Sequence, residues 1–222
     1  MVKLDDIEKV FKQRNWWDLI VNLKITKYLT YYIANYTKLT PNQITLISLI
    51  FAVFAGIAFL NQYYVAGAIL YQISYIFDIV DGALARVTNQ TSKFGAFLDV
   101  FTDWLKAPLL IIILLWDKQF FLITILFLLF INCCINKYND MLFFTTKKSI
   151  TKSNEILKSK IGKYFEFMKA KYIQPLPGIV EFEALVLFFY PIFKSDIFLW
   201  LGIGLLLLLF LMKFFVVYKK LK

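Results

Sequence analysis

The chain has 222 residues, of which 60% are hydrophobic and 18% charged, and its formal net charge is +10. Soluble domains have about 45–50% apolar residues, so this composition excludes a disordered tail, a small disulfide scaffold and an ordinary water-soluble enzyme. The sequence has no histidine, which excludes a Ser-His catalytic pair, histidine-ligated zinc and a histidine proton relay. In so apolar a chain the basic excess indicates membrane topology and contact with membrane lipids, and we expect no nucleic acid partner.

Residues 1–40 are predicted to form an interfacial amphipathic segment. They lack the central apolar stretch of a cleavable signal peptide. Apolar residues recur there at helical spacing, with cations between them and aromatic residues after them: Leu4, Ile7, Val10, Phe11, Trp16 and Trp17. Aromatic residues with intervening cations favour the lipid headgroup layer. The alternative is a helix that packs on a soluble partner.

Long apolar runs follow, and they predict six membrane spans. Thr40-Pro41 is a helix-start signal, with Thr as N-cap and Pro at the first helical position. A span needs about 20 predominantly apolar residues to cross a ~30 Å hydrocarbon layer. The expected fold class is an all-α integral membrane protein, with residues 41–217 as its transmembrane domain. The predicted spans are 41–60, 65–86, 94–116, 119–143, 177–193 and 197–217.

The distribution of cations predicts the orientation of these spans. Residues 1–40 contain seven Lys or Arg residues, the stretch 137–175 contains nine Lys, and four more Lys lie at the C-terminal end. The connections on the other side carry almost no positive charge. By the positive-inside rule, we expect both termini, the loop 144–175 and the tail 218–222 to face the cytoplasm.

Four carboxylates lie in the second and third predicted spans. Asp78 and Asp81 are three residues apart and share one helix face, as do Asp99 and Asp103, which are four apart. A short polar turn joins the two spans, so they are antiparallel neighbours. We therefore expect the four acids to converge near the cytoplasmic side.

Such a cluster is costly unless it binds cations. An Asp at mid-membrane costs about 2.5–3.5 kcal/mol on insertion scales, and mutual repulsion adds to this. Hard oxygen ligands favour Mg²⁺ or Mn²⁺, and four carboxylates suffice for two ions of the kind that serve phosphate chemistry. Nearby small residues, Gly82, Ala85 and Gly95, leave space for a bulky ligand, and Arg86 suits a diphosphate.

These residues form a recognisable signature. The pattern D-x2-D-G-x2-A-R-x8-G-x3-D-x3-D runs from Asp78 to Asp103 and matches at all eight fixed positions. The chain thereby resembles the CDP-alcohol phosphotransferase family. The stretch Thr40-Pro41-Asn42, with Thr45, and the six-span layout extend the resemblance over most of the chain.

The resemblance implies an enzyme that moves a phosphoalcohol from a CDP-linked donor to an acceptor hydroxyl and releases CMP, in phospholipid or related head-group synthesis. It implies that Asp78, Asp81 and Asp99 are metal ligands, and that Asp103 contributes to the metal site and is the catalytic base. It also implies a homodimer. The residues implied to border the nucleotide are Asn42, Thr45, Asp78, Gly82, Ala85, Arg86 and Gly95.

Donor and acceptor stay open at this point. The donor is either CDP-diacylglycerol or the CDP ester of a small head group. Only two arginines exist in the chain, which disfavours a phosphorylated acceptor because bidentate phosphate capture favours Arg. Candidate acceptor contacts are Lys106, Lys137, Glu181 and Glu183. The two glutamates have an alternative place at the N-terminus of the fifth span, where acids are favoured.

A second hypothesis is a cation-coupled transporter that uses the intramembrane carboxylates. Alternating access favours inverted repeats and helices broken at mid-depth. We find neither pattern in the sequence. The enzyme hypothesis is therefore the preferred one.

Overall fold

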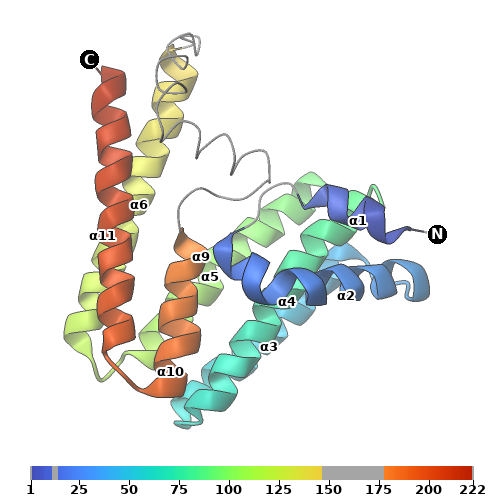
Figure 1. Ribbon diagram of the computed structural model, residues 1–222, viewed down its shortest axis with the longest axis horizontal. Helices are drawn as coiled ribbons and strands as arrows, with labels where there is room; N and C mark the ends of the chain where they lie inside the picture. The colour runs from blue at the N-terminus through green and yellow to red at the C-terminus, as the bar shows by residue number, and fades with distance from the viewer. Residues whose placement is uncertain (1, 12–14, 147–177, 222) are drawn as a thin grey trace.

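The computed structural model describes residues 2–11, 15–146 and 178–221, and the regular structure of these residues is helical throughout (Figure 1). The all-α prediction is confirmed for the described chain. The helical elements are α1 (Leu4–Val10), the π-helical turn η1 (Asp18–Asn22), α2 (Leu23–Tyr36), α3 (Pro41–Leu60), α4 (Tyr64–Val87), α5 (Lys93–Leu114), α6 (Gln119–Thr146), α9 (Ile179–Glu183), the π-helical run η2 (Ala184–Phe189), α10 (Tyr190–Phe193) and α11 (Ile197–Leu221).

Local capping signals fix where the helices near the site begin. Thr40 caps α3 in a capping box with Gln43, and Pro41 is the first residue of the helix. Ser92 caps α5, and its hydroxyl accepts a hydrogen bond from the Gly95 amide at 2.9 Å. The short turns before and after α4 contain the left-handed residues Gln62 and Asn89. Such tight connections make α4 antiparallel to both α3 and α5.

Four described helical segments are long and apolar enough to cross a membrane: Pro41–Leu60, Tyr64–Val87, Gln119–Tyr138 and Ile197–Phe215. Helix α5 is not among them, and its carboxylates and Lys106 explain why. The helical run 179–193 is shorter than the roughly 20 residues that a span usually needs. The predicted loop 144–175 lies, from residue 147 on, outside the described residues.

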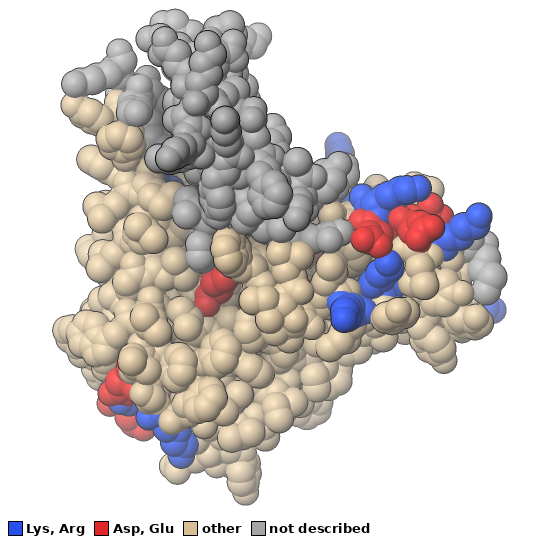
Figure 2. Space-filling model, viewed as in Figure 1, with Lys and Arg blue, Asp and Glu red and all other residues tan. Residues whose placement is uncertain are grey.

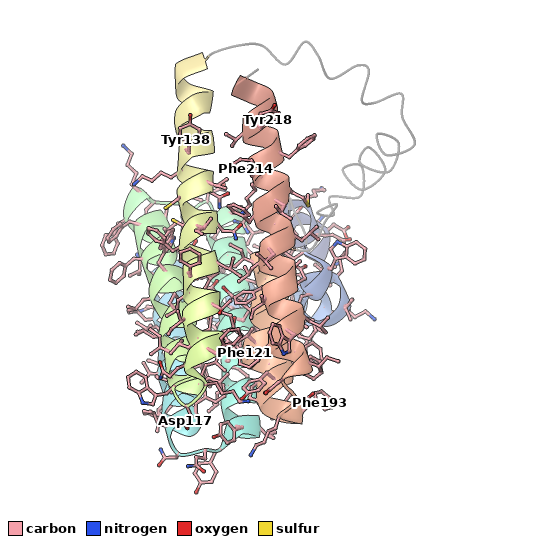
Figure 3. All side chains as sticks on the ribbon, turned by 90° about the vertical axis from the view of Figure 1, so that its left-hand side faces the viewer. Asp117, Phe121, Tyr138, Phe193, Phe214 and Tyr218 are labelled. Atoms are coloured by element: carbon pink, nitrogen blue, oxygen red, sulfur yellow. The ribbon has the colours of Figure 1, made fainter. Side chains whose placement is uncertain are left out.

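Helices α6 and α11 stand side by side (Figures 1 and 3). In Figure 3, Asp117 and Phe193 lie at one end of this pair, and Tyr138 and Tyr218 lie toward the other. Asn132 of α6 joins the two helices through a hydrogen bond from its Nδ2 to the carbonyl of Leu206 in α11 at 3.2 Å. Both helices therefore run in the same direction from the same end of the molecule.

The exterior of the helices is strongly apolar. Large side chains such as Phe54, Ile57, Phe127 and Leu211 are exposed. On the face drawn in Figure 2, charged residues gather over the N-terminal helices and at the opposite lower edge, with a broad, mostly uncharged expanse between them. A soluble monomer rarely exposes so large an apolar surface. Together with the four long apolar helices, this makes the chain an integral membrane protein.

The N-terminal helices pack on α4 of the same chain. Ile7 and Phe11 are buried against Ala83, and Ile33 of α2 is buried with Val80 and Leu84. In Figure 1, α2 runs across the direction of α6 and α11. The apolar stripe of the N-terminal segment is thus used at least in part to cover α4.

Candidate active site

The predicted carboxylates meet where α4 turns into α5. Asp78 and Asp81 come from α4, and Asp99 and Asp103 come from α5. One carboxylate oxygen from each of Asp78, Asp99 and Asp103 lies within 4.8 Å of the other two. Three of the four acids therefore come close enough to share a cation.

Asp81 is the fourth acid and has a different partner. Its side chain is buried, and its Oδ2 accepts a hydrogen bond from the Thr45 hydroxyl at 2.5 Å. Thr45 belongs to α3, so this bond ties α3 to α4 at the level of the carboxylates. One Asp81 oxygen is thus held by a partner on a neighbouring helix.

Lys106 enters the cluster from α5, one turn after Asp103. Its Nζ forms an ion pair with Asp78 and lies 3.2 Å from Asp103 Oδ1. It also donates a hydrogen bond to the Ser48 hydroxyl at 3.2 Å. The structure therefore places this lysine, predicted as an acceptor contact, among the candidate metal ligands.

Two glycines of the signature allow close approach. A Cβ on Gly82 would lie 3.3 Å from Arg86 Nη1, so the guanidinium lies over the Gly82 backbone. A Cβ on Gly95 would lie 3.0 Å from Asn42 Oδ1. Gly95 thereby lets the start of α3 approach the start of α5. This approach brings Asn42 and Gly95, both predicted to border the nucleotide, close together.

A cavity of about 400 Å³ contains the four acids together with Gly82 and Arg86. Asn42, Thr45, Ala85 and Gly95 are not among the described residues that line it. Its other wall was not predicted, because that wall comes from the N-terminal segment. The lining residues from this segment are Val10, Phe11, Asn15, Asp18, Leu23 and Thr26.

Asp18 anchors this wall to α4. Its Oδ1 accepts hydrogen bonds from the Tyr75 hydroxyl at 2.9 Å and from Asn22 Nδ2 at 3.2 Å. Burial raises the pKa of Asp18, and the bonds from Asn22 and Tyr75 oppose that rise. A half-buried acid with several donors, on a segment read as a membrane-surface helix, is a signal that sequence reasoning passed over.

A second cavity of about 850 Å³ shares Asp78, Asp103 and Tyr75 with the first. Apolar side chains such as Trp104 and Leu129 form much of its wall. Two further predicted acceptor residues, Lys137 and Glu183, line it as well. Glu183 Oε2 accepts a hydrogen bond from the Tyr71 hydroxyl at 2.8 Å. The carboxylate cluster thus lies at the junction of a polar and a largely apolar cavity.

Glu181 lies elsewhere. Its Oε1 accepts hydrogen bonds from the backbone amides of Trp16 at 2.7 Å and Trp17 at 3.3 Å. Its Oε2 accepts one from the Gly178 amide at 2.6 Å. Glu181 is not among the described residues that line either cavity. It connects the N-terminal segment to α9.

The donor set fits a divalent cation. Asp78, Asp99 and Asp103 offer three hard oxygen ligands in one small volume, and such ligands are those that Mg²⁺ and Mn²⁺ prefer. No described His or Cys joins this group, so its composition does not favour zinc or copper.

A solved structure has a similar fold. The chain resembles the crystal structure of Mycobacterium tuberculosis phosphatidylinositol phosphate synthase (PgsA1) with CDP-DAG bound, with a TM-score of 0.53 and 18% sequence identity, over 88% of this chain and 94% of that one. At this identity, the likeness establishes a shared fold.

Curated relatives match over shorter stretches. Archaetidylinositol phosphate synthase of Pyrococcus horikoshii is 40% identical over 68 residues, which are 31% of this chain and 36% of the relative. The bifunctional IPC transferase and DIPP synthase of Archaeoglobus fulgidus is 40% identical over 102 residues, which are 44% of this chain and 20% of the relative. The chain thus matches about a third or less of the length of these relatives.

The family profile described as CDP-alcohol phosphatidyltransferase matches residues 38–212. This range contains the whole aspartate signature and both residues of the Thr45–Asp81 hydrogen bond. The resemblance drawn from the signature is confirmed: the chain belongs to the CDP-alcohol phosphatidyltransferase family.

Proposed function

We propose that this protein is a metal-dependent CDP-alcohol phosphotransferase that transfers a phosphoalcohol to an acceptor hydroxyl and releases CMP. The observation that carries the proposal is the carboxylate cluster at the junction of two cavities, in a member of a family named for this reaction. The protein's relatives include an archaetidylinositol phosphate synthase and a phosphatidylinositol phosphate synthase, which favours a role in phospholipid or related head-group synthesis. The transporter hypothesis has no support in these relatives.

Asp78, Asp81, Asp99 and Asp103 would hold two divalent ions, Mg²⁺ or Mn²⁺. Such ions neutralise a diphosphate and stabilise the charge that develops during phosphoryl transfer. The protein's own part is to fix the acids. Thr45 holds Asp81 by its hydroxyl, and the antiparallel α4 and α5 hold the other three acids within reach of one another.

The CDP-linked donor is proposed to bind in the first cavity. Arg86 lies over Gly82 at its wall, where a guanidinium can pair with phosphate oxygens. The remaining nucleotide contacts are proposed to be Asn42, Thr45, Ala85 and Gly95, by position in the signature and its extension. The mycobacterial structure has CDP-DAG bound, which supports CDP-diacylglycerol as the donor.

Asp103 is proposed as the catalytic base. It borders both cavities, so it can face a donor in one and an acceptor hydroxyl in the other. The acceptor oxygen attacks the β-phosphorus, the bond from that phosphorus to the bridging oxygen breaks, and CMP leaves. The proton of the acceptor hydroxyl passes to the Asp103 carboxylate.

The acceptor is proposed to be a polyol that enters the second cavity. Glu183 and Tyr71 provide a hydrogen-bonded pair there, and Lys137 provides a positive charge. These groups can bind hydroxyls and a single phosphate. Lys106 faces the same cavity but is engaged with carboxylates.

We also propose six spans with both termini in the cytoplasm. Helices α3 and α4 are joined by a short turn, so α4 ends on the side where α3 begins. Helix α5 starts on that side, and α6 starts on the other, so α5 must cross. Helices α6 and α11 start from the same end (Figure 3), so the run 179–193 must bring the chain back.

The basic termini favour the cytoplasmic side, and the family resemblance favours a homodimer.

The test is an assay of the full-length protein in detergent or nanodiscs. CMP release is measured with CDP-diacylglycerol and a panel of inositol, inositol phosphate, glycerol phosphate and serine, with Mg²⁺, with Mn²⁺ and with a chelator. We expect metal-dependent CMP release with a polyol acceptor. The control is Asp117→Asn, which changes an exposed acid in the turn between α5 and α6. Absence of CMP release with every acceptor and metal would refute the proposal.

A further inference from the structure

The Lys106 side chain contacts residues of three helices at the carboxylate cluster. It belongs to α5, pairs with Asp78 of α4 and with Asp103 of its own helix, and donates to Ser48 of α3. The Ser48 hydroxyl in turn donates a hydrogen bond to the Ser74 carbonyl of α4 at 2.9 Å. Only 8% of the lysine side chain is exposed, so its ammonium has few partners besides these.

The charge of this ammonium has a clear function when no metal is bound. Four carboxylates gather here, and Asp78 is largely buried. Among the described residues, Lys106 is the cation that forms ion pairs with these acids, whereas Arg86 is exposed and lies over Gly82. A buried carboxylate without a partner is strongly destabilising. Lys106 therefore holds Asp78 and Asp103 in place.

The same contacts conflict with metal binding. Asp78 and Asp103 are two of the three acids whose oxygens lie within 4.8 Å of one another. An ammonium bonded to them occupies lone pairs that a divalent ion would use, and its charge repels that ion. A metal and the Lys106 ammonium therefore compete for one pair of carboxylates.

We propose that Lys106 is an internal counter-cation, which occupies the carboxylate cluster in the metal-free protein and yields Asp78 and Asp103 to the divalent ion when it binds. This inference rests on the proposed function and adds to it a determinant of metal affinity. The ammonium keeps the Ser48 hydroxyl as a partner and borders the second cavity, so its release leaves it hydrogen-bonded and within reach of ligands in that cavity.

Two other roles for Lys106 predict different behaviour. If it were only an acceptor contact, its removal would weaken acceptor binding and leave metal affinity unchanged. If it were only a structural link between helices, its removal would lower stability with and without metal alike. The counter-cation role alone predicts that metal binds more tightly after the lysine is removed.

The experiment measures Mn²⁺ binding to the full-length protein by isothermal titration calorimetry, with thermal unfolding in parallel. We expect Lys106→Gln to bind Mn²⁺ at least tenfold more tightly than the wild type, and to lose more thermal stability than the wild type when a chelator is added. Lys106→Arg keeps the charge and should bind Mn²⁺ within about threefold of the wild type. The matched control is Lys93→Gln, which removes an exposed cation from the first turn of α5 and should leave the affinity unchanged.

A variant that needs metal in order to fold is purified with Mg²⁺ and then treated with chelator, and its larger loss of stability supports the proposal. Unchanged or weaker Mn²⁺ binding by Lys106→Gln, with binding by the wild type intact, overturns the counter-cation role and leaves the proposed function standing. No Mn²⁺ binding by either protein overturns both the inference and the metal site of the proposed function.

Discussion

Thr45 and Asp81 form a buried hydrogen bond between α3 and α4, with 2.5 Å between the Thr45 hydroxyl and Asp81 Oδ2. A hydroxyl that donates to a carboxylate makes a charge-assisted bond, which is stronger than a bond between neutral groups. This bond orients one oxygen of an acid that the signature assigns to metal binding. Thr45 and Asp81 are 36 residues apart in the sequence.

The first prediction concerns this bond. Thr45→Val keeps the shape of the side chain and removes the donor, so a buried carboxylate oxygen loses its partner. We expect a loss of about 1–3 kcal/mol in the free energy of unfolding and a weaker response of CMP release to Mg²⁺. Chemical denaturation and a Mg²⁺ titration of activity measure the two effects. Thr45→Ser retains the hydroxyl and should behave as the wild type, and a Val variant with unchanged Mg²⁺ response would show that Thr45 has no part in the metal site.

The second prediction concerns Gly82. A methyl group on this residue would lie 3.3 Å from Nη1 and 3.4 Å from Nη2 of Arg86, so Gly82→Ala forces the guanidinium to shift. We expect the KM for the CDP-linked donor to rise about tenfold, the order of one charge-assisted hydrogen bond. Steady-state kinetics with varied donor concentration measure it.

The control for this change is Gly204→Ala in α11, where an added Cβ meets no atom within 4 Å. That variant should leave the KM and the thermal stability unchanged. An equal KM in the Gly82→Ala variant and the wild type would mean that Arg86 does not bind the donor in this orientation.

The third prediction concerns Glu181. Glu181→Ala removes the acceptor of the Trp16, Trp17 and Gly178 amides. The contact is partly exposed, so we expect a loss of only about 1 kcal/mol in stability. Because residues 15 and 18 line the first cavity, the KM for the donor should rise.

Hydrogen exchange is the most direct measurement for this change, because amides 15–18 should exchange faster in the variant. Glu181→Gln keeps one acceptor oxygen and should give an intermediate rate. If exchange at these amides stayed at the wild-type rate while acceptor affinity fell, Glu181 would be an acceptor contact, as the sequence suggested, and not an anchor of the N-terminal segment.

The convergence of the acids was predictable because it depends on local geometry. Spacings of three and four residues place each pair on one helix face, and the short turn before α5 brings the faces together. The position of Lys106 beside Asp103 is equally local, since the two are three residues apart. Its contact with Asp78 depends on how α4 and α5 pack, and sequence reasoning therefore placed the lysine in the acceptor site.

The N-terminal wall of the first cavity could not be predicted in this way. Asp18 reaches Tyr75 over 57 residues of sequence, and Trp16 reaches Glu181 over 165. No spacing rule connects such pairs. The segment's apolar and aromatic pattern fits the membrane surface and also fits the face of α4, and only the packing decides between the two surfaces.

The last prediction concerns Asp103, the acid that borders both cavities and whose side chain is 51% exposed. Asp103→Asn keeps the size of the side chain and removes the proposed base. Positioned proton transfer contributes about 10²–10⁴-fold to a rate, so we expect kcat for CMP release to fall by that factor. The binding of CDP-diacylglycerol, measured separately by calorimetry, should fall far less, because Asp78, Asp81, Asp99 and Arg86 remain in the first cavity.

Asp78→Asn provides the contrast. Asp78 is a candidate metal ligand and the partner of Lys106, so its loss should weaken Mn²⁺ binding and donor binding together. A rate in the Asp103→Asn variant that returns to the wild-type value at high Mg²⁺ would assign Asp103 to metal binding alone. A low rate at saturating Mg²⁺, with donor binding intact, is the result that the role of base requires, because added metal cannot replace the lost proton acceptor.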